Sequence, residues 1–211
     1  MKEWSSFDEL FTTLNNSEIT YVILRNFEEI KDFNSFVLHP DIDFLCDDSK
    51  KMNLLLGATP RNKNKDLVHS KICLCGNIIP VDIRSVGDGY YDKSWEQMIL
   101  DNRETSEHGF YVPNREDYYY SLCYHAIFHK KSISEEYDSK LNDLRKIIDL
   151  DIKPGDVLDD LENYMRIHNF WYTFPRNYYG FLNTKNVDPK LIKPVSRLRL
   201  KIQSIIKHSN K

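Results

Sequence analysis

The sequence has no long apolar run, and its first residues do not show the pattern expected of a secretory leader. Met1–Ser5 does not have the basic-then-apolar layout of a signal peptide. No stretch reaches the ~18 consecutive apolar residues that a membrane span needs. We therefore expect a cytoplasmic protein, with any membrane contact peripheral and at the inner face.

Paired cysteine motifs are also missing. None of the four cysteines falls into the C-x-x-C spacing of a structural zinc site; they are Cys46, Cys73, Cys75 and Cys123. Because free cysteine usually behaves as a small hydrophobe, we expect Cys73 and Cys75 to be buried on one side of a strand. Reduced thiols fit a cytoplasmic protein.

The chain has no excess of positive charge. Its 29 Lys and Arg residues are outnumbered by 32 Asp and Glu residues, for a formal net charge of -3. This balance argues against coating nucleic acid through bulk charge, so we do not expect nucleic acid to be a partner. A hydrophobic content of 41% in 211 residues is enough for a sizeable core, in one domain or in two small lobes.

The first half of the chain carries the patterns of a small sheet. Residues 20–24 are β-branched or apolar throughout, which predicts a central strand buried on both faces. Residues 41–48 alternate acidic and apolar side chains with the period of a strand. Two more strand-like runs, 71–75 and 78–84, flank Gly76-Asn77, a two-residue hairpin signal. The sheet should therefore contain at least four strands.

Helical patterns occur at the start of the chain and dominate its second half. Ser6 and Glu9 read as a capping box for a helix from Ser6 to Asn15, and a second helix should run from Ser49 to Leu56 and end at Gly57. Further helices are expected at roughly 114–130, 134–148, 156–168 and from about 188. We expect an α+β protein with a small mixed or antiparallel sheet lobe over residues 1–112 and a helical lobe over residues 113–211.

Three aspartates predict a metal site. Asp41 and Asp43 are two apart on a strand, so their carboxylates point the same way, and like charges this close are costly unless a cation or protons neutralise them. Asp82, in another apolar strand, could reach the same cation. Such oxygen ligands suit the paired magnesium ions of phosphoryl and nucleotidyl transfer. On alternation alone, Asp41-Ile42-Asp43 fits the solvent face of an amphipathic edge strand equally well.

The order of these motifs resembles the DNA polymerase β superfamily of nucleotidyltransferases. Its strand, turn, Asp-x-Asp strand and third-Asp strand correspond to residues 21–30, 39–48 and 81–84, and residues 118–130 are similar to one of its helices. The likeness is to poorly characterised bacterial nucleotidyltransferase-like proteins found among surface-polysaccharide genes. It implies a lobe of nucleotidyltransferase type, Mg²⁺ or Mn²⁺ as cofactor, and a nucleoside triphosphate or other nucleotide as donor. It also implies a small-molecule or glycan acceptor, and catalytic and metal-binding roles for Asp41, Asp43 and Asp82.

The turn after the first strand departs from this family. The family usually has Gly-Ser there, where the backbone and hydroxyl contact nucleotide phosphates, and this chain has Arg25-Asn26. Arginine can bind phosphate bidentately and asparagine can donate through its amide, so we expect both to hold donor phosphates. Two alternatives stay open: an Asp-x-Asp glycosyltransferase that uses a sugar nucleotide, and a catalytically inactive domain that binds nucleotide or a partner protein.

Basic residues later in the chain have more than one interpretation. His125 and His129 are spaced i and i+4 on a predicted helix, but no third zinc ligand is evident. With Lys130 they either border the cleft and bind phosphate or acceptor, or are core histidines. Residues 188–207 form a basic amphipathic pattern, which favours packing on the helical lobe over peripheral contact with a membrane. The oligomeric state cannot be predicted from the sequence.

Overall fold

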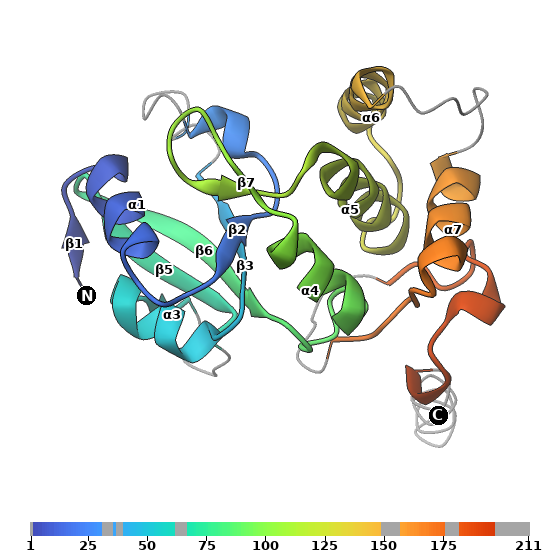
Figure 1. The fold of residues 1–211 in the computed structure, drawn as a ribbon, viewed down its shortest axis with the longest axis horizontal. Helices are drawn as coiled ribbons and strands as arrows, with labels where there is room; N and C mark the ends of the chain where they lie inside the picture. The colour runs from blue at the N-terminus through green and yellow to red at the C-terminus, as the bar shows by residue number, and fades with distance from the viewer. Residues whose placement is uncertain are drawn as a thin grey trace, which may run out of the picture. The chain divides into compact units, whose positions relative to one another are not determined.

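The computed structural model describes residues 2–30, 36, 40–61, 67–148, 157–175 and 182–196 (Figure 1). The chain is an α+β protein that divides into two compact units. One unit comprises residues 1–88 and 96–118, and the other comprises residues 89–95 and 119–211. No helix in the described part of the chain is both long and apolar enough to cross a membrane.

The first unit is built on a six-stranded mixed sheet. Its strand order is β1-β5-β6-β3-β2, with β4 also paired to β5. Strand β3 runs parallel to β6, and the β2–β3 and β5–β6 pairs are antiparallel. A separate two-stranded sheet joins β7 to β8. The strands are β1 Glu3–Trp4, β2 Tyr21–Ile23, β3 Ile42–Cys46, β4 Thr59–Pro60, β5 His69–Leu74, β6 Asn77–Ser85, β7 Glu104–Thr105 and β8 Tyr111–Val112.

The core of this unit lies between one face of the sheet and helices α1 (Phe7–Asn15) and α3 (Ser49–Leu56) (Figure 1). Alternate residues of the long strands point into it, and the helices contribute apolar residues at helical spacing. Its members include Leu10, Leu14, Ile42, Phe44, Met52, Leu56, Ile72, Leu74, Ile79, Val81 and Ile83. Side chains at the intervening strand positions, Asp43 and Asp82 among them, therefore lie on the opposite face of the sheet.

The predicted start of α1 and the predicted end of α3 are confirmed. Ser6 caps α1 by accepting a hydrogen bond from the Glu9 backbone N–H at 3.1 Å. The Glu9 carboxylate returns to the N–H of Ser5, at 2.8 Å, and not to that of Ser6 as a strict capping box would require. Helix α3 ends at Gly57, whose φ of 60° is the left-handed conformation of a glycine stop.

Strand β2 corrects one prediction. It is an edge strand of the sheet and not a central one, although all three of its residues are buried. The Tyr21 ring packs edge-on against the Tyr111 ring of β8, with 5.6 Å between centroids. An apolar run indicates that a strand is buried, but it does not show whether neighbouring strands or the side chains of other elements bury it.

The β5–β6 hairpin turns one residue earlier than predicted. Cys75 and Gly76 have φ values of 50° and 73°, as in a type I′ turn, and Leu74 pairs with Asn77. Cys75 is therefore exposed in the turn and not buried in the strand. The turn shift moves every cross-strand partner of β6 by two positions along β5.

Helices α4 (Lys93–Asp101) and α5 (Arg115–Phe128) each contribute residues to both units. Helices α6 (Glu135–Ile147) and α7 (Val157–His168) belong to the second unit, whose core is strongly aromatic. Its largest buried side chains include Trp95, Tyr119, Tyr124, Phe128 and Tyr172. The helices predicted at 114–130, 134–148 and 156–168 are thus present, with ends that differ by at most two residues.

The predicted helix from residue 188 does not form as a continuous element. A 3-10 helix covers Pro189–Leu191, Ile192 is extended and bridges to Tyr172, and helical residues resume at 194–196. Pro194 explains the break, because proline disfavours the helical conformation in the residue before it. The remainder of the predicted amphipathic stretch, residues 197–207, lies outside the described residues, so its predicted membrane contact stays a prediction.

Candidate functional site: an acidic row on the sheet

Two of the predicted aspartates lie side by side on neighbouring strands. Asp43 of β3 is in register with Asp82 of β6, and Asp82 is in register with His69 of β5. Residues in register share a face, so these side chains form a row across the face opposite the core. Strand β3 lies between β6 and β2, and Asp43 is 4% exposed. The solvent-face, edge-strand interpretation of Asp41-Ile42-Asp43 is therefore wrong.

Arg25 neutralises Asp43. Its Nε lies 2.7 Å from Asp43 Oδ2, and both side chains are mostly buried. The N–H of Leu24 donates to the Asp43 carbonyl at 2.8 Å, which continues the pairing of β2 with β3 up to this turn. Asn26 then adopts a φ of 57° and precedes the 3-10 helix η1 (Phe27–Glu29), with no side-chain capping bond. Asparagine visits this left-handed conformation more readily than most residues, which suits it to the turn.

Asp82 has two basic neighbours that the sequence did not single out. Its Oδ1 accepts a hydrogen bond from Arg61 and lies 2.9 Å from Nδ1 of His69. Burial alone would raise the pKa of Asp82. The hydrogen bond from His69 and the positive charges of His69, Arg61 and Arg84 outweigh this effect and hold the pKa below its usual value. Asp82 is thus a carboxylate at neutral pH.

Asp41 is the least compensated of the three aspartates. Its Oδ1 is buried and has no hydrogen-bond partner among the residues that the structure describes. Burial, reinforced by the negative charges of Asp43 and Asp82, raises the pKa of Asp41 to about 7, although Arg61 and Arg25 oppose the shift. One more positive charge, either a proton or a cation, would therefore compensate the negative charge of Asp41.

The three aspartates offer the ligand atoms that a divalent cation prefers, but they are not arranged as a complete coordination shell. Carboxylate oxygens are the ligands that Mg²⁺ and Mn²⁺ prefer, and the buried oxygen of Asp41 is available to such an ion. In the described ranges, however, no three Asp, Glu, His or Cys side chains are arranged to hold a metal. Arg25 and Arg61 already supply positive charge beside Asp43 and Asp82.

The predicted basic residues His125, His129 and Lys130 belong to the second unit, whereas the acidic row belongs to the first. His125 Nδ1 lies 2.7 Å from the Tyr90 hydroxyl, and the Tyr90 ring stacks on His129 with 4.2 Å between centroids. Lys130 lies over the Tyr137 ring. His129 directly follows α5 and its N–H donates to the His125 carbonyl at 3.1 Å, so the predicted i and i+4 spacing is present, with 5.9 Å between the two ring centroids.

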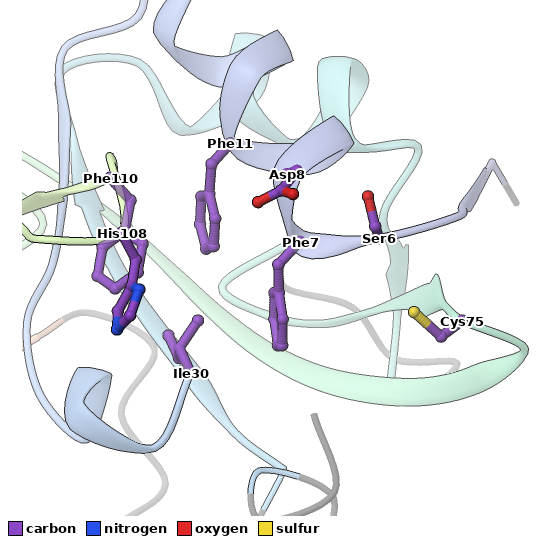
Figure 2. Close-up of a pocket in the computed structure, with 8 residues that line it drawn as sticks. All are labelled: Ser6, Phe7, Asp8, Phe11, Ile30, Cys75, His108 and Phe110. Carbon is purple, nitrogen blue, oxygen red and sulfur yellow. The ribbon is translucent and has the colours of Figure 1, made fainter. Parts of the chain in front are cut away.

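A separate hollow lies beside the first turn of α1 (Figure 2). Three phenylalanine rings and Ile30 make most of its wall, with polar groups from Asp8 and His108. Its lining residues are Ser6, Phe7, Asp8, Phe11, Ile30, Cys75, His108 and Phe110. These eight include none of the residues predicted for catalysis or cofactor binding.

Comparison of the chain with protein-family models, with curated proteins and with solved structures yields no match. Inferences about function therefore rest on the acidic row and on the order of the sequence motifs.

Proposed function

We propose that the chain is a metal-dependent transferase whose first unit is of nucleotidyltransferase type. It transfers a nucleotidyl or related phospho-group from a nucleotide donor to a hydroxyl or phosphate of a small molecule or glycan. One observation carries the proposal: Asp43 and Asp82 are in register on neighbouring strands, and Asp41 beside them has a buried oxygen without a partner among the described residues. The order of the motifs along the chain supports it.

Each residue of the row has a role in this reaction. Asp41 and Asp43 would hold the divalent ions, and Asp82 would complete the ligand set. When bound, such ions lower the pKa of the attacking hydroxyl and stabilise charge on the leaving group. His69 orients Asp82 through their 2.9 Å contact, and Arg25 orients Asp43. Arg25 also keeps its predicted role as a residue that binds the donor phosphates. Asn26, on the turn after Arg25, offers its amide to the donor phosphates.

A second candidate is a metal-free domain that binds a nucleotide or a partner without catalysis. The ion pairs of Arg25 with Asp43 and of Arg61 with Asp82 favour it, because they already compensate two of the three carboxylates. Such a domain has no need of a cation for stability, since a proton on Asp41 completes the balance.

A titration with Mg²⁺ and Mn²⁺ distinguishes these candidates. Binding of each of the four nucleoside triphosphates is followed by calorimetry for the wild type and for an Asp41→Asn/Asp43→Asn variant. The matched control is Asp138→Asn/Asp143→Asn, which makes the same change at two exposed positions of α6. We expect metal-dependent binding of one nucleotide by the wild type and the control but not by the site variant.

Two outcomes of this titration would contradict the transferase proposal. If no nucleotide binds, or if binding ignores both the metal and the two aspartates, the transferase proposal is wrong. Binding that needs neither metal nor Asp41 and Asp43 supports the metal-free domain.

A further inference from the structure

The two arginines of the acidic row differ in how firmly they are held. Arg25 and Asp43 have side chains that are 11% and 5% exposed. Arg61 and Asp82 have side chains that are 34% and 15% exposed, so this pair lies on the solvent side of the row. An ion pair costs less to separate the more it is exposed to solvent. Of the two arginines, Arg61 is therefore the counter-ion that leaves its aspartate at the lower cost.

The backbone of Arg61 is nevertheless fixed near the site. It follows β4, and its N–H donates to the His69 carbonyl at 2.9 Å, which extends the pairing of β4 with β5. A guanidinium group released from Asp82 would therefore stay within the length of one side chain of the row. His69 still contacts Asp82 when Arg61 leaves, so the carboxylate keeps its orientation.

From this contrast we infer that Arg61 is an exchangeable counter-ion. It neutralises Asp82 while no divalent cation is bound, and it transfers to a phosphate group of the donor when a cation takes its place on the carboxylate. Guanidinium groups bind phosphate oxygens bidentately, as they do carboxylate oxygens, so the exchange replaces one charged hydrogen-bonding partner by another. The inference rests on the proposed function and adds a donor-binding residue to it.

The exchange predicts that removal of Arg61 changes the affinities for metal and for phosphate in opposite directions. In the free protein Arg61 competes with the metal for Asp82, so its removal should tighten metal binding. In the loaded protein Arg61 contacts the donor phosphates, so its removal should weaken phosphate binding. A merely structural role would not produce this pair of effects, because disruption of the site weakens both ligands.

The test compares the wild type with Arg61→Met and uses probes that do not require the donor to be known. Calorimetry measures Mn²⁺ alone and then the manganese complex of inorganic triphosphate. We expect Arg61→Met to bind Mn²⁺ about two- to fivefold more tightly, the worth of a partly exposed ion pair. We expect it to bind manganese triphosphate about tenfold more weakly, the worth of a charged hydrogen bond.

Two further variants control for folding and for the loss of a charge. Arg115→Met removes an exposed arginine at the start of α5 and should leave both affinities unchanged. Arg61→Gln keeps a polar side chain and carries the test if Arg61→Met does not give the circular dichroism spectrum of the wild type. Each variant is compared only after its unfolding midpoint is measured.

The outcomes separate this inference from the proposed function. Tighter Mn²⁺ with weaker manganese triphosphate supports the exchange. If the wild type binds Mn²⁺ but the Arg61 variants change both affinities in the same direction, or neither, the exchange is wrong and the metal site stands. If neither the wild type nor any variant binds Mn²⁺, the proposed function and the exchange are both overturned.

Discussion

The two faces of the same sheet bury side chains of opposite character, apolar on one face and charged on the other. On β3, Ile42, Phe44 and Cys46 face the core and are fully buried, and Asp43 between them faces the other side and is almost as buried. Burying an apolar side chain contributes about 1.5–3 kcal/mol, whereas burying a carboxylate costs free energy unless a cation or hydrogen bonds compensate it. The apolar face therefore supplies the stability that holds the acidic face together.

The largest expected effect is on the apolar face. Phe44→Ala removes a ring that is 0% exposed, and we expect a loss of about 3–5 kcal/mol in the free energy of unfolding because the cavity cannot fully collapse. Urea denaturation followed by circular dichroism measures it. Leu54→Ala on α3 is the control, because Leu54 is 84% exposed and should change stability by less than about 0.5 kcal/mol. Equal losses in both variants would contradict the assignment of the core face.

The acidic face should respond with the opposite sign. Asp41→Asn removes a charge from a crowded group of carboxylates, so in EDTA at pH 8 we expect it to stabilise the protein by about 2 kcal/mol. The same variant should lose Mn²⁺ binding. Chemical denaturation in EDTA and calorimetry with Mn²⁺ measure the two effects.

The stabilisation by Asp41→Asn should increase as pH rises. Because the pKa of Asp41 is raised to about 7 in the folded state, folded protein binds more protons than unfolded protein between about pH 4 and pH 7. Wild-type stability from this group is therefore lost as pH rises through that window, and the difference from Asp41→Asn should vanish near pH 4. A difference that stays constant from pH 4 to pH 8 would show that Asp41 is not perturbed.

The smallest expected effect tests the turn that sets the register of β5 against β6. Gly76→Ala should cost about 1 kcal/mol, because Gly76 has a φ of 73° and left-handed backbone is unfavourable for alanine. An added Cβ would meet nothing within 4 Å, so the cost is conformational and not steric. Gly76→Ala as stable as the wild type would argue against the Cys75-Gly76 turn.

Local signals were sufficient where neighbours in the sequence decide the structure. The ends of α1 and α3 depend on Ser6, Glu9 and Gly57, whose side chains or backbone act within four residues of the helix end. The alternation in β3 correctly separated the core-facing side chains from Asp43 because strand geometry allows only two faces.

The cationic partners of the site could not be predicted because they depend on register. With Gly76-Asn77 as the turn, Lys71 would lie opposite Asp82. With Cys75-Gly76 as the turn, His69 takes that place. A change of one residue in the turn decides which basic side chain faces the aspartate. Arg61 depends in addition on the pairing of β4 with β5, for which its local sequence has no distinctive pattern.

The sequence by itself determined the α+β class, most of the helices and the strand that carries Asp41 and Asp43, because propensities, caps and periodicity act over a few residues. Only the tertiary structure decided that β2 is an edge strand, that Asp43 lies beside Asp82, and that Arg25, Arg61 and His69 contact them. These features depend on the pairing of strands distant in the chain. Such pairing is set by the free energy of the whole core and not by any one segment.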